Sequence, residues 1–360
     1  MNNSNNYCVI MGGGVGSRFW PFSKEEKPKQ FLDFLGTGRS LLQGTFDRFK
    51  KIVPMENIYV ITNDAYEEMT KKQLPELQDH QILCEPMRRN TAPAIAFAMY
   101  RIKAVNPQAN IVVAPSDHLV LKEEQFIADI VNGLDFVEQN SMLLTLGIKP
   151  GRPETGYGYI QLPNKEMSGI QKVKTFTEKP NYELAKKFVE SGEFVWNSGI
   201  SIWNINSILA AFRTYLPDIV NRFDTGKHLF GTADEKKFID EMFAFCPNIS
   251  LEYGVLEKAD NVYVNISNFG WCDLGTWSAF HEVSARDEND NASLYCKSLF
   301  VESSDNIVAM SDGKLVVVQG LDGYIVAESD NVLLICKKSE EQRIKHFVAD
   351  VKFRYGDEYL

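Results

Sequence analysis

The chain has 360 residues, 44% of them hydrophobic and 24% charged, which is typical of a folded globular protein with one large domain or two unequal ones. Its net charge of −10, without a basic stripe, argues against a general nucleic-acid binder. No apolar run is long enough to span a membrane, and the first residues do not have the pattern of a signal peptide. The six cysteines include no C-x-x-C pair. We therefore expect a cytoplasmic protein with reduced cysteines and neither a nucleic-acid nor a membrane partner.

Short apolar runs alternate with longer periodic segments over the first two thirds of the chain. This alternation predicts an α/β fold, with one open sheet flanked by helices and ligands at the carboxyl ends of the strands. The strands are expected at residues 7–11, 58–62, 81–84, 111–114 and 142–148, and two of the helices at 92–105 and 125–140.

The pattern changes at about Ser293, where short β-rich runs alternate with Asp-Asn and Asp-Gly turns. The spacing predicts a small all-β module with stacked rungs, closed by a helix. We expect a catalytic domain at 1–286 and this module at 287–360, with the linker at 287–291. The apolar face of the closing helix would carry Ile344, Phe347, Val348, Val351 and Tyr355.

A glycine-rich loop follows the first expected strand and reads MGGGVGSRFWP from Met11, with PKQF after it from Pro28. Glycines let backbone N–H groups approach phosphate oxygens. A Rossmann fingerprint would need a glycine in place of Phe19, and a P-loop would need Gly-Lys-Ser/Thr. Arg18 and Lys29 supply cations, so the segment predicts a phosphate-binding loop of another kind.

Two acidic residues stand in settings that suit a divalent metal. Asp117 lies in PSDH, directly after an expected strand, and Asp273 lies in WCDLGTW. Carboxylates at strand ends can hold Mg²⁺ beside a phosphate. Each acid by itself fits a helix cap or a turn equally well.

Further motifs combine glycine, aromatic and polar residues: GYGYI from Gly156, FTEKP from Phe176, WNSGI from Trp196 and EPMRRNTAPA from Glu85. Each has a purely structural interpretation, namely a glycine bulge, solvated charges at a strand end, or a helix N-cap at Asn90 or Thr91. Guanine offers N–H donors that the carboxylate of Glu85 could accept.

Taken in order, these motifs resemble those of the sugar-1-phosphate nucleotidyltransferases, and PKQF and RNTAPA resemble the guanylyltransferase branch. The resemblance implies a Rossmann-like domain with a mixed, mostly parallel sheet and a small C-terminal domain like a left-handed β-helix. The resemblance implies three catalytic cations, Arg18, Lys29 and Lys179, and two Mg²⁺ ligands, Asp117 and Asp273. It places around the nucleotide the residues Gly12, Gly13, Gly14, Gly16, Ser17, Glu85, Arg88 and Asn90. It places around the sugar phosphate the residues Gly158, Glu178, Lys179 and Asn197.

The implied reaction transfers GMP from GTP to α-D-mannose 1-phosphate by Mg²⁺-dependent in-line attack, giving GDP-mannose and pyrophosphate. Another nucleotide or hexose 1-phosphate is an alternative, as is a non-catalytic sugar-nucleotide-binding regulatory protein. A nucleotide-sugar glycosyltransferase would usually need a D-x-D motif, which PSDH lacks. The five histidines show no metal-ligand spacing, so no metal-dependent isomerase site is expected. A homodimer is possible.

Overall fold

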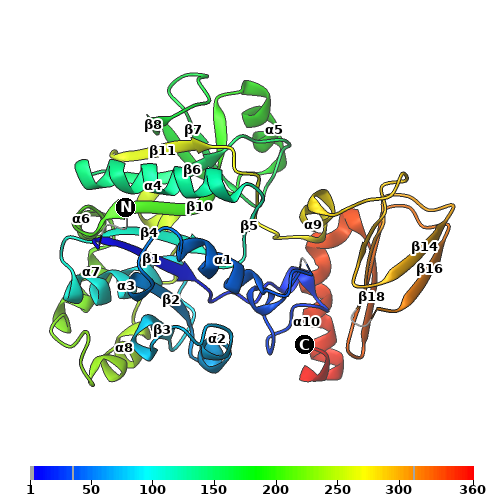
Figure 1. The fold of residues 1–360 in the computed structure, drawn as a ribbon, viewed down its shortest axis with the longest axis horizontal. Helices are drawn as coiled ribbons and strands as arrows, with labels where there is room; N and C mark the ends of the chain where they lie inside the picture. Colours follow the sequence, from blue (N-terminus) through cyan, green and yellow to red (C-terminus); the bar gives the residue numbers. More distant parts are fainter. Residues whose placement is uncertain (1–3, 35, 311–312) are drawn as a thin grey trace. The chain divides into compact units, whose positions relative to one another are not determined.

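The computed structural model describes residues 4–34, 36–310 and 313–360, which belong to two compact units (Figure 1). The first unit comprises Met1–Gly13, Thr45–Ser116 and Val120–Trp271, and the second Gly14–Gly44, Asp117–Leu119 and Cys272–Leu360. The second unit thus combines the end of the chain with two segments from its first half. The predicted boundary between residues 286 and 287 stays a prediction.

A ten-stranded sheet forms the centre of the first unit, with the strand order β3-β2-β1-β4-β10-β6-β11-β8 and a β7–β9 ribbon joined to β10. Its strands are β1 (Asn6–Met11), β2 (Ile58–Asn63), β3 (Ile82–Glu85), β4 (Asn110–Pro115), β6 (Leu143–Ile148), β7 (Gly158–Gln161), β8 (Ile170–Lys172), β9 (Thr175–Glu178), β10 (Phe194–Asn204) and β11 (Val262–Ser267). Strands β3, β2, β1 and β4 are parallel, and β10 runs antiparallel to both of its neighbours β4 and β6. The predicted mixed α/β sheet is confirmed.

Helices cover both faces of this sheet. Trp203 and Ile202 are adjacent on β10 and therefore point to opposite faces. The Trp203 indole contacts the sulfur of Met99 in α3, whereas Ile202 lies against Gly133 in α4, so α3 and α4 lie on opposite faces (Figure 1). The helices of this unit are α2 (Glu67–Gln73), α3 (Thr91–Val105), α4 (Glu123–Gln139), α5 (Tyr182–Ser191), α6 (Ile205–Tyr215), α7 (Pro217–Thr225) and α8 (Glu235–Phe243).

The sequence prediction missed the strand at the centre of the sheet, β10, and also the strands β8 and β11. All five predicted strands and both predicted helices are present, with ends shifted by one or two residues. Strand β10 was not expected, because its sequence FVWNSGISIWN contains residue types that are depleted in strands. A register shift between Asn197 and Ser201 accommodates its central glycine.

The chain passes between the units more than once. Helix α1 (Leu41–Phe49) spans one of these passages, and the short strands β5 (Leu119–Val120) and β12 (Trp271–Cys272), which pair with each other, span two more.

Stacked parallel strands form the C-terminal part of the second unit. Strands β13 (Ala292–Leu294), β15 (Ile307–Met310) and β17 (Tyr324–Ser329) stack in one sheet, closed by antiparallel β18 (Val332–Lys337), and β14 (Lys297–Val301) pairs with β16 (Leu315–Gln319). Bonds between successive rungs join residues 15 positions apart at the first step, such as Asn291 and Asn306, and 18 positions apart at the next, such as Ser304 and Asp322. The predicted rung-like β module is confirmed, whereas its left-handedness stays a prediction.

Asparagine side chains replace hydrophobic packing at one corner of these rungs. The Asn306 side chain is fully buried. Its Nδ2 donates to Asn291 Oδ1 at 3.0 Å and to the Leu321 carbonyl at 2.8 Å, and its Oδ1 accepts from the Tyr324 N–H at 2.9 Å. These bonds satisfy the turn backbone between rungs.

A second core lies between the glycine loop and the C-terminal residues of the second unit. Phe19 packs 4.7 Å from Phe34 and 5.1 Å from Trp277 by ring centroids, in the same cluster as residues of the β module. The short helical turns η1 (Ser17–Phe19) and η2 (Lys29–Phe31), helix α9 (Trp277–Val283) and the closing helix α10 (Ile344–Tyr355) surround this core.

The apolar face predicted for the closing helix is mostly confirmed. Ile344 is fully buried, and Phe347, Val348 and Val351 pack on the second core. Tyr355 was wrongly assigned to this face and is 66% exposed, because the helix ends there and its ring lies beyond the core.

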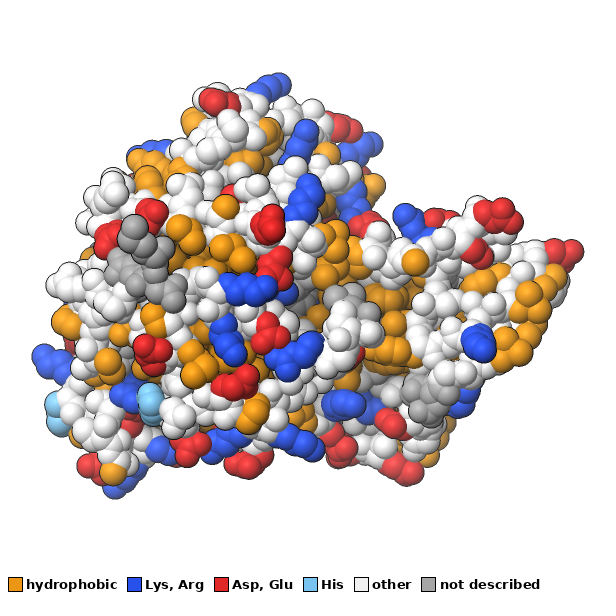
Figure 2. Space-filling model, viewed as in Figure 1, with side chains coloured by type: hydrophobic (Ala, Val, Ile, Leu, Met, Phe, Trp, Pro, Cys, Tyr) orange, Lys and Arg blue, Asp and Glu red, His pale blue; other side chains and the backbone are white. Residues whose placement is uncertain are grey.

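Two further surface features concern association. Leu299, Val301, Leu315 and Val317 form an exposed aliphatic patch on β14 and β16, in the hydrophobic area at the right of Figure 2. Within the part of the chain that the structure describes, no helix has the length and apolar character needed to cross a membrane.

Candidate active site

The glycine loop is held in one backbone conformation by the segment around Lys29. Gly16 has φ 71°, and a β-carbon there would lie 2.6 Å from Lys29 Cβ, so both the left-handed backbone and the close contact require glycine. Gln30 Nε2 donates to the Gly14 carbonyl at 2.9 Å. The two loop motifs that the sequence analysis singled out are therefore one structural element.

Lys29 is the centre of this element. Its side chain is only 4% exposed, and its Nζ lies 2.7 Å from Asp117 Oδ2. The same ammonium donates to the carbonyls of Asp273 at 3.0 Å and of Leu274 at 2.8 Å. Because an ammonium has three N–H donors, Lys29 is fully engaged and joins three distant segments of the chain.

Of the two predicted metal ligands, Asp117 contacts this ammonium through its carboxylate and Asp273 through its backbone carbonyl. Burial acts to raise the pKa of Asp117, but the charges of Lys29 and then His118 outweigh it, so this pKa lies below its ordinary value. Asp273 Oδ1 accepts a hydrogen bond from the Gly275 N–H at 2.8 Å, and Leu274 between them has a positive φ of 45°. Both carboxylates are oriented by local bonds.

A pocket of about 370 Å³ in the second unit brings many of the predicted residues together. Its lining includes Arg18, Lys29, Asp117, His118, Asp273 and Lys345. Oxygen ligands next to cations suit a divalent metal bound together with a phosphate. The arrangement fits the predicted metal pair, and Lys345, which the sequence analysis missed, lies on the C-terminal helix α10.

Glu85, predicted to contact the base, lies in the first unit at the end of β3. Its side chain is buried, its Oε1 has no hydrogen-bond partner among the described residues, and its Oε2 would lie 3.4 Å from a β-carbon on Gly13. Burial raises its pKa to about 8, and the charge of Arg88 opposes this shift. A buried acceptor next to the glycine loop is suited to bind a ligand that donates hydrogen bonds.

The other predicted base-side residues have structural partners. Arg88 donates to the Tyr66 hydroxyl at 2.8 Å. Asn90 has φ 65° and caps α3 by accepting from the Thr91 N–H at 2.9 Å, as the structural interpretation predicted.

The predicted sugar residues form a separate group in the first unit. Gly158 pairs with Glu178 across β7 and β9, and a β-carbon at Gly158 would lie 2.4 Å from Glu178 Oε2. Lys179 has a positive φ of 47°, and its Nζ lies 2.9 Å from Glu178 Oε1. Since Glu178 Oε2 is buried and has no partner among the described residues, it is available to a ligand hydroxyl.

Asn197 is oriented for donation. Its Oδ1 accepts from Thr145 Oγ1 at 2.7 Å and from the Gly199 N–H at 3.3 Å. No described residue accepts a hydrogen bond from its Nδ2, so these N–H groups remain available as donors.

The sequence analysis missed a π-helical turn, Glu252–Leu256, that contacts this group. Glu257 Oε1, just after the turn, accepts from the Glu178 N–H at 3.0 Å, and the Tyr253 hydroxyl donates to the Glu178 carbonyl at 3.5 Å. Burial, and then the Glu178 carboxylate, raise the pKa of Glu252. The sequence here has an ordinary helical pattern, so no local signal indicates the π turn, although such turns are frequent at functional sites.

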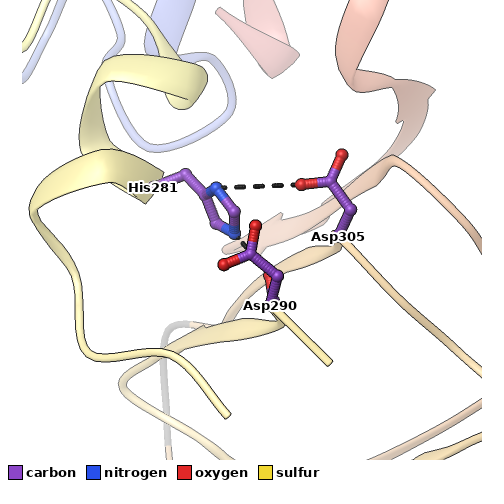
Figure 3. A group of neighbouring side chains, drawn as sticks. All are labelled: His281, Asp290 and Asp305. Carbon is purple, nitrogen blue, oxygen red and sulfur yellow. Dashed lines mark hydrogen bonds and ion pairs between the residues drawn. The ribbon is translucent and has the colours of Figure 1, made fainter. Parts of the chain in front are cut away.

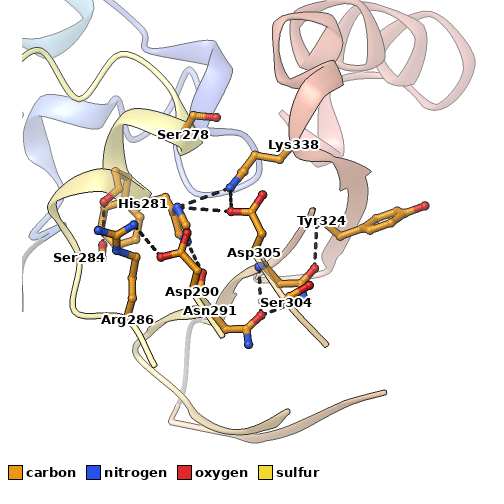
Figure 4. A network of polar contacts seen from close by, with 12 residues as sticks. Ser278, His281, Ser284, Arg286, Asp290, Asn291, Ser304, Asp305, Tyr324 and Lys338 are labelled. Carbon is orange, nitrogen blue, oxygen red and sulfur yellow. Dashed lines mark hydrogen bonds and ion pairs between the residues drawn. The ribbon is translucent and has the colours of Figure 1, made fainter. Parts of the chain in front are cut away.

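One group of side chains outside these sites has metal-like spacing: His281, Asp290 and Asp305 lie close together (Figure 3). The sequence analysis found no metal-ligand spacing among the histidines and did not detect this group, because its residues come together only in the folded chain. Lys338 supplies the cation here, as it pairs with Asp305 and lies 3.5 Å from His281 Nδ1 (Figure 4). His281 Nε2 donates to the Asp290 carbonyl at 2.7 Å, so the group is a structural polar network between α9 and the first rungs.

The Lys29 network should contribute strongly to stability. Replacing Lys29 with Met leaves the Asp117 carboxylate partly buried without its cation, which should lower the free energy of unfolding by about 3 kcal/mol. Urea denaturation at pH 7 without added metal measures this, and K29M/D117N should recover part of the loss. Lys24→Met is the matched control, because the Lys24–Asp330 pair involves an exposed aspartate and should contribute under about 1 kcal/mol. Equal losses in K29M and K24M would contradict the role of Lys29.

Glu85 should make stability depend on pH. Its folded pKa lies above its ordinary value, so the folded chain holds a proton that the unfolded chain loses as pH rises from about 4.5 to about 8. Wild-type stability should therefore fall relative to Glu85→Gln, by roughly 3 kcal/mol between pH 5 and pH 8. Denaturation at pH 5 and pH 8 checks this, with exposed Glu56→Gln as the control. A difference between E85Q and wild type that does not change with pH would show that Glu85 ionises normally.

Comparison with known proteins supports one family. Residues 7–290 match the family model described as "Nucleotidyl transferase". The chain is 34% identical to a mannose-1-phosphate guanylyltransferase of Escherichia coli over 94% of the chain and 74% of the relative. It is 33% identical to the alginate biosynthesis protein AlgA of Pseudomonas syringae over 95% of the chain and 71% of the relative.

A solved structure agrees with the fold. It is described as a mannose-1-phosphate geranyltransferase from Thermus thermophilus and has a TM-score of 0.86 at 29% identity, covering 97% of this chain and 99% of that one. Enzymes of the matched family generally depend on a divalent metal, which agrees with a pocket lined by two carboxylates. On its sequence match, its fold and the arrangement of its site, the chain belongs to the nucleotidyl transferase family.

Proposed function

We propose that this enzyme transfers GMP from GTP to α-D-mannose 1-phosphate, giving GDP-mannose and pyrophosphate. The names of two relatives, both mannose-1-phosphate guanylyltransferases, support the substrates. The observation that carries the chemistry is the pocket lined by Asp117, Asp273 and Arg18, in which Lys29 bonds the Asp117 carboxylate and the Asp273 carbonyl. Such a site is suited to a reaction whose barrier is raised by repulsion between two negatively charged substrates.

The step is an in-line displacement at the α-phosphorus of GTP. A phosphate oxygen of the sugar phosphate forms the new P–O bond while the bond from the α-phosphorus to the bridging oxygen breaks, and pyrophosphate leaves with that electron pair. The nucleophile is already ionised, so no covalent enzyme intermediate is required. Two unit charges ~4 Å apart repel by about 4 kcal/mol at an effective dielectric of ~20, so orientation and charge neutralisation must lower the barrier.

The second unit would neutralise the triphosphate. Arg18 is exposed in the pocket and can form two parallel bonds to phosphate oxygens. Asp117 and Asp273 would hold Mg²⁺, which when bound neutralises charge on the phosphates. Because Lys29 is already bonded to the segments of both carboxylates, its first role would be to fix their positions.

The first unit would select the base and the sugar. Glu85 could accept from the N1–H and N2–H₂ groups of guanine, which would favour its ionised form. Glu178 Oε2 and the Asn197 amide offer an acceptor and a donor to sugar hydroxyls. Lys179 would bind the phosphate of the sugar substrate as a compact point charge.

Pyrophosphate release from purified protein with Mg²⁺ tests this function. Each nucleoside triphosphate is combined with mannose, glucose, galactose and N-acetylglucosamine 1-phosphate. Release only with GTP and mannose 1-phosphate is expected. Activity with a different pair would retain the reaction type but overturn the substrate assignment, and GTP binding without any release would favour a regulatory protein.

We further propose a cytoplasmic homodimer. All six cysteines are free, which fits a reducing compartment. Leu299 and Val317 are cross-strand neighbours in the exposed aliphatic patch, and a second copy of this sheet face would be its natural complement. Light scattering should give twice the chain mass of 40.9 kDa, and Leu315→Asp with Val317→Asp should give monomers. A monomeric wild type, or a dimer unaffected by the double variant, would contradict this interface.

A further inference from the structure

The pocket of about 370 Å³ that is lined by Arg18, Asp117 and Asp273, called the phosphate pocket below, also contains a cation from the C-terminal helix. Lys345 is the second residue of α10 (Ile344–Tyr355) and lines the same pocket as Arg18, Asp117 and Asp273. All of these residues belong to the second unit. We propose that Lys345 is a phosphate-binding residue of this site, which places the C-terminal helix in the binding machinery. The proposal rests on the proposed function, which it deepens.

Helix α10 is anchored next to the glycine loop by apolar packing. Ile344, directly before Lys345, is fully buried in the cluster that contains Phe19 and Trp20. Val348, one turn further, lines a second pocket together with Ser17 and Trp20. The buried face of the helix therefore packs on residues adjacent to Arg18, which places Lys345 at the edge of the phosphate pocket.

Polar contacts fix the same arrangement from both sides. The indole of Trp20 donates to the Tyr359 carbonyl at 2.8 Å, which ties the residues after α10 to the loop. Lys24 pairs with Asp330 at 2.8 Å and ties the loop to the β module. Lys345 is thus carried by a helix whose position is determined at several points.

Lys29 is already paired, so binding of a polyanion in this pocket depends on its other cations. The Lys29 ammonium is used by Asp117 and two carbonyls, so it neutralises a carboxylate rather than an incoming phosphate. Among the described residues, neither Arg18 nor Lys345 has a hydrogen-bond or ion-pair partner of its own. These two side chains are the cations of the pocket that remain available to a polyanion. With Lys345 the pocket carries three cations against two carboxylates, and without it the charges balance.

Geometry also separates Lys345 from the other cations of its helix. Lys345 lines both pockets, whereas Lys352 lines only the second one and pairs with Asp357 at 2.8 Å. Arg354 is exposed near the end of α10 and lines neither pocket. Arg354→Ala is therefore a matched control, since it removes one exposed cation from the same helix away from the phosphate pocket.

Calorimetric titration of the full chain with inorganic pyrophosphate and with GTP, each with Mg²⁺, tests the assignment. Lys345→Ala and Lys345→Gln should weaken both ligands roughly tenfold, as expected for one charged contact to phosphate. Lys345→Arg should stay within about threefold of wild type because the charge remains. The affinity should also depend less steeply on salt in K345A than in wild type. Thermal unfolding of each variant confirms that the fold is retained.

Three results would overturn the proposal: K345A binding both ligands as wild type does, R354A losing as much affinity as K345A, or wild type binding neither ligand. The outcomes for the two proposals are separable. If pyrophosphate binding depends on Lys345 but the protein makes no GDP-mannose, the proposed function fails and this assignment stands. If GDP-mannose forms equally well and with the same KM for GTP in wild type and K345A, the assignment fails and the function stands.

Discussion

The three bonds of the Lys29 ammonium are the interaction on which the site depends. They join the segment after the glycine loop to the end of β4 and to the loop that follows β12, which are far apart in the sequence. A buried ammonium is stable only when all its donors have partners, so this geometry admits little variation. The position of Gly16 against Lys29, and hence the course of the phosphate loop, follows from the same constraint.

The second unit is built from three separate segments, and its core explains why they stay together. Aromatic rings from the loop region, such as Phe19 and Phe34, pack with Trp277 and with the β module. The glycine loop, the two carboxylates and the C-terminal helix therefore share one hydrophobic core. Under the proposed function, the C-terminal module would support phosphate binding directly, since it holds the helix that carries Lys345.

Three of the eight described non-glycine residues with positive φ lie in predicted site motifs, and the other five lie between residues 290 and 330, in and before the rungs of the β module. Asn90, Lys179 and Leu274 are non-glycine residues with positive φ, and each belongs to a predicted site motif or lies next to a predicted metal ligand. Such conformations cost free energy and persist only where surrounding contacts impose them. At Lys179 these contacts are visible, because Tyr253 and Glu257 bind the two sides of the preceding residue's backbone.

The sequence by itself determined the elements whose signal is local. Apolar runs of β1 to β4, the Asp-Gly turns between rungs and the order of the glycine, acidic and aromatic motifs were sufficient for the fold class and for most candidate residues. Only the tertiary structure decided that Lys29 is bonded to Asp117 and to two backbone carbonyls, and that burial raises the pKa of Glu85. It also decided that β10 lies in the middle of the sheet and that Lys345 lines the pocket. Each of these depends on contacts between residues distant in the chain, such as Lys29 and Asp273, which are 244 positions apart. Such contacts leave no periodic pattern in the sequence, because they are set by how whole elements pack.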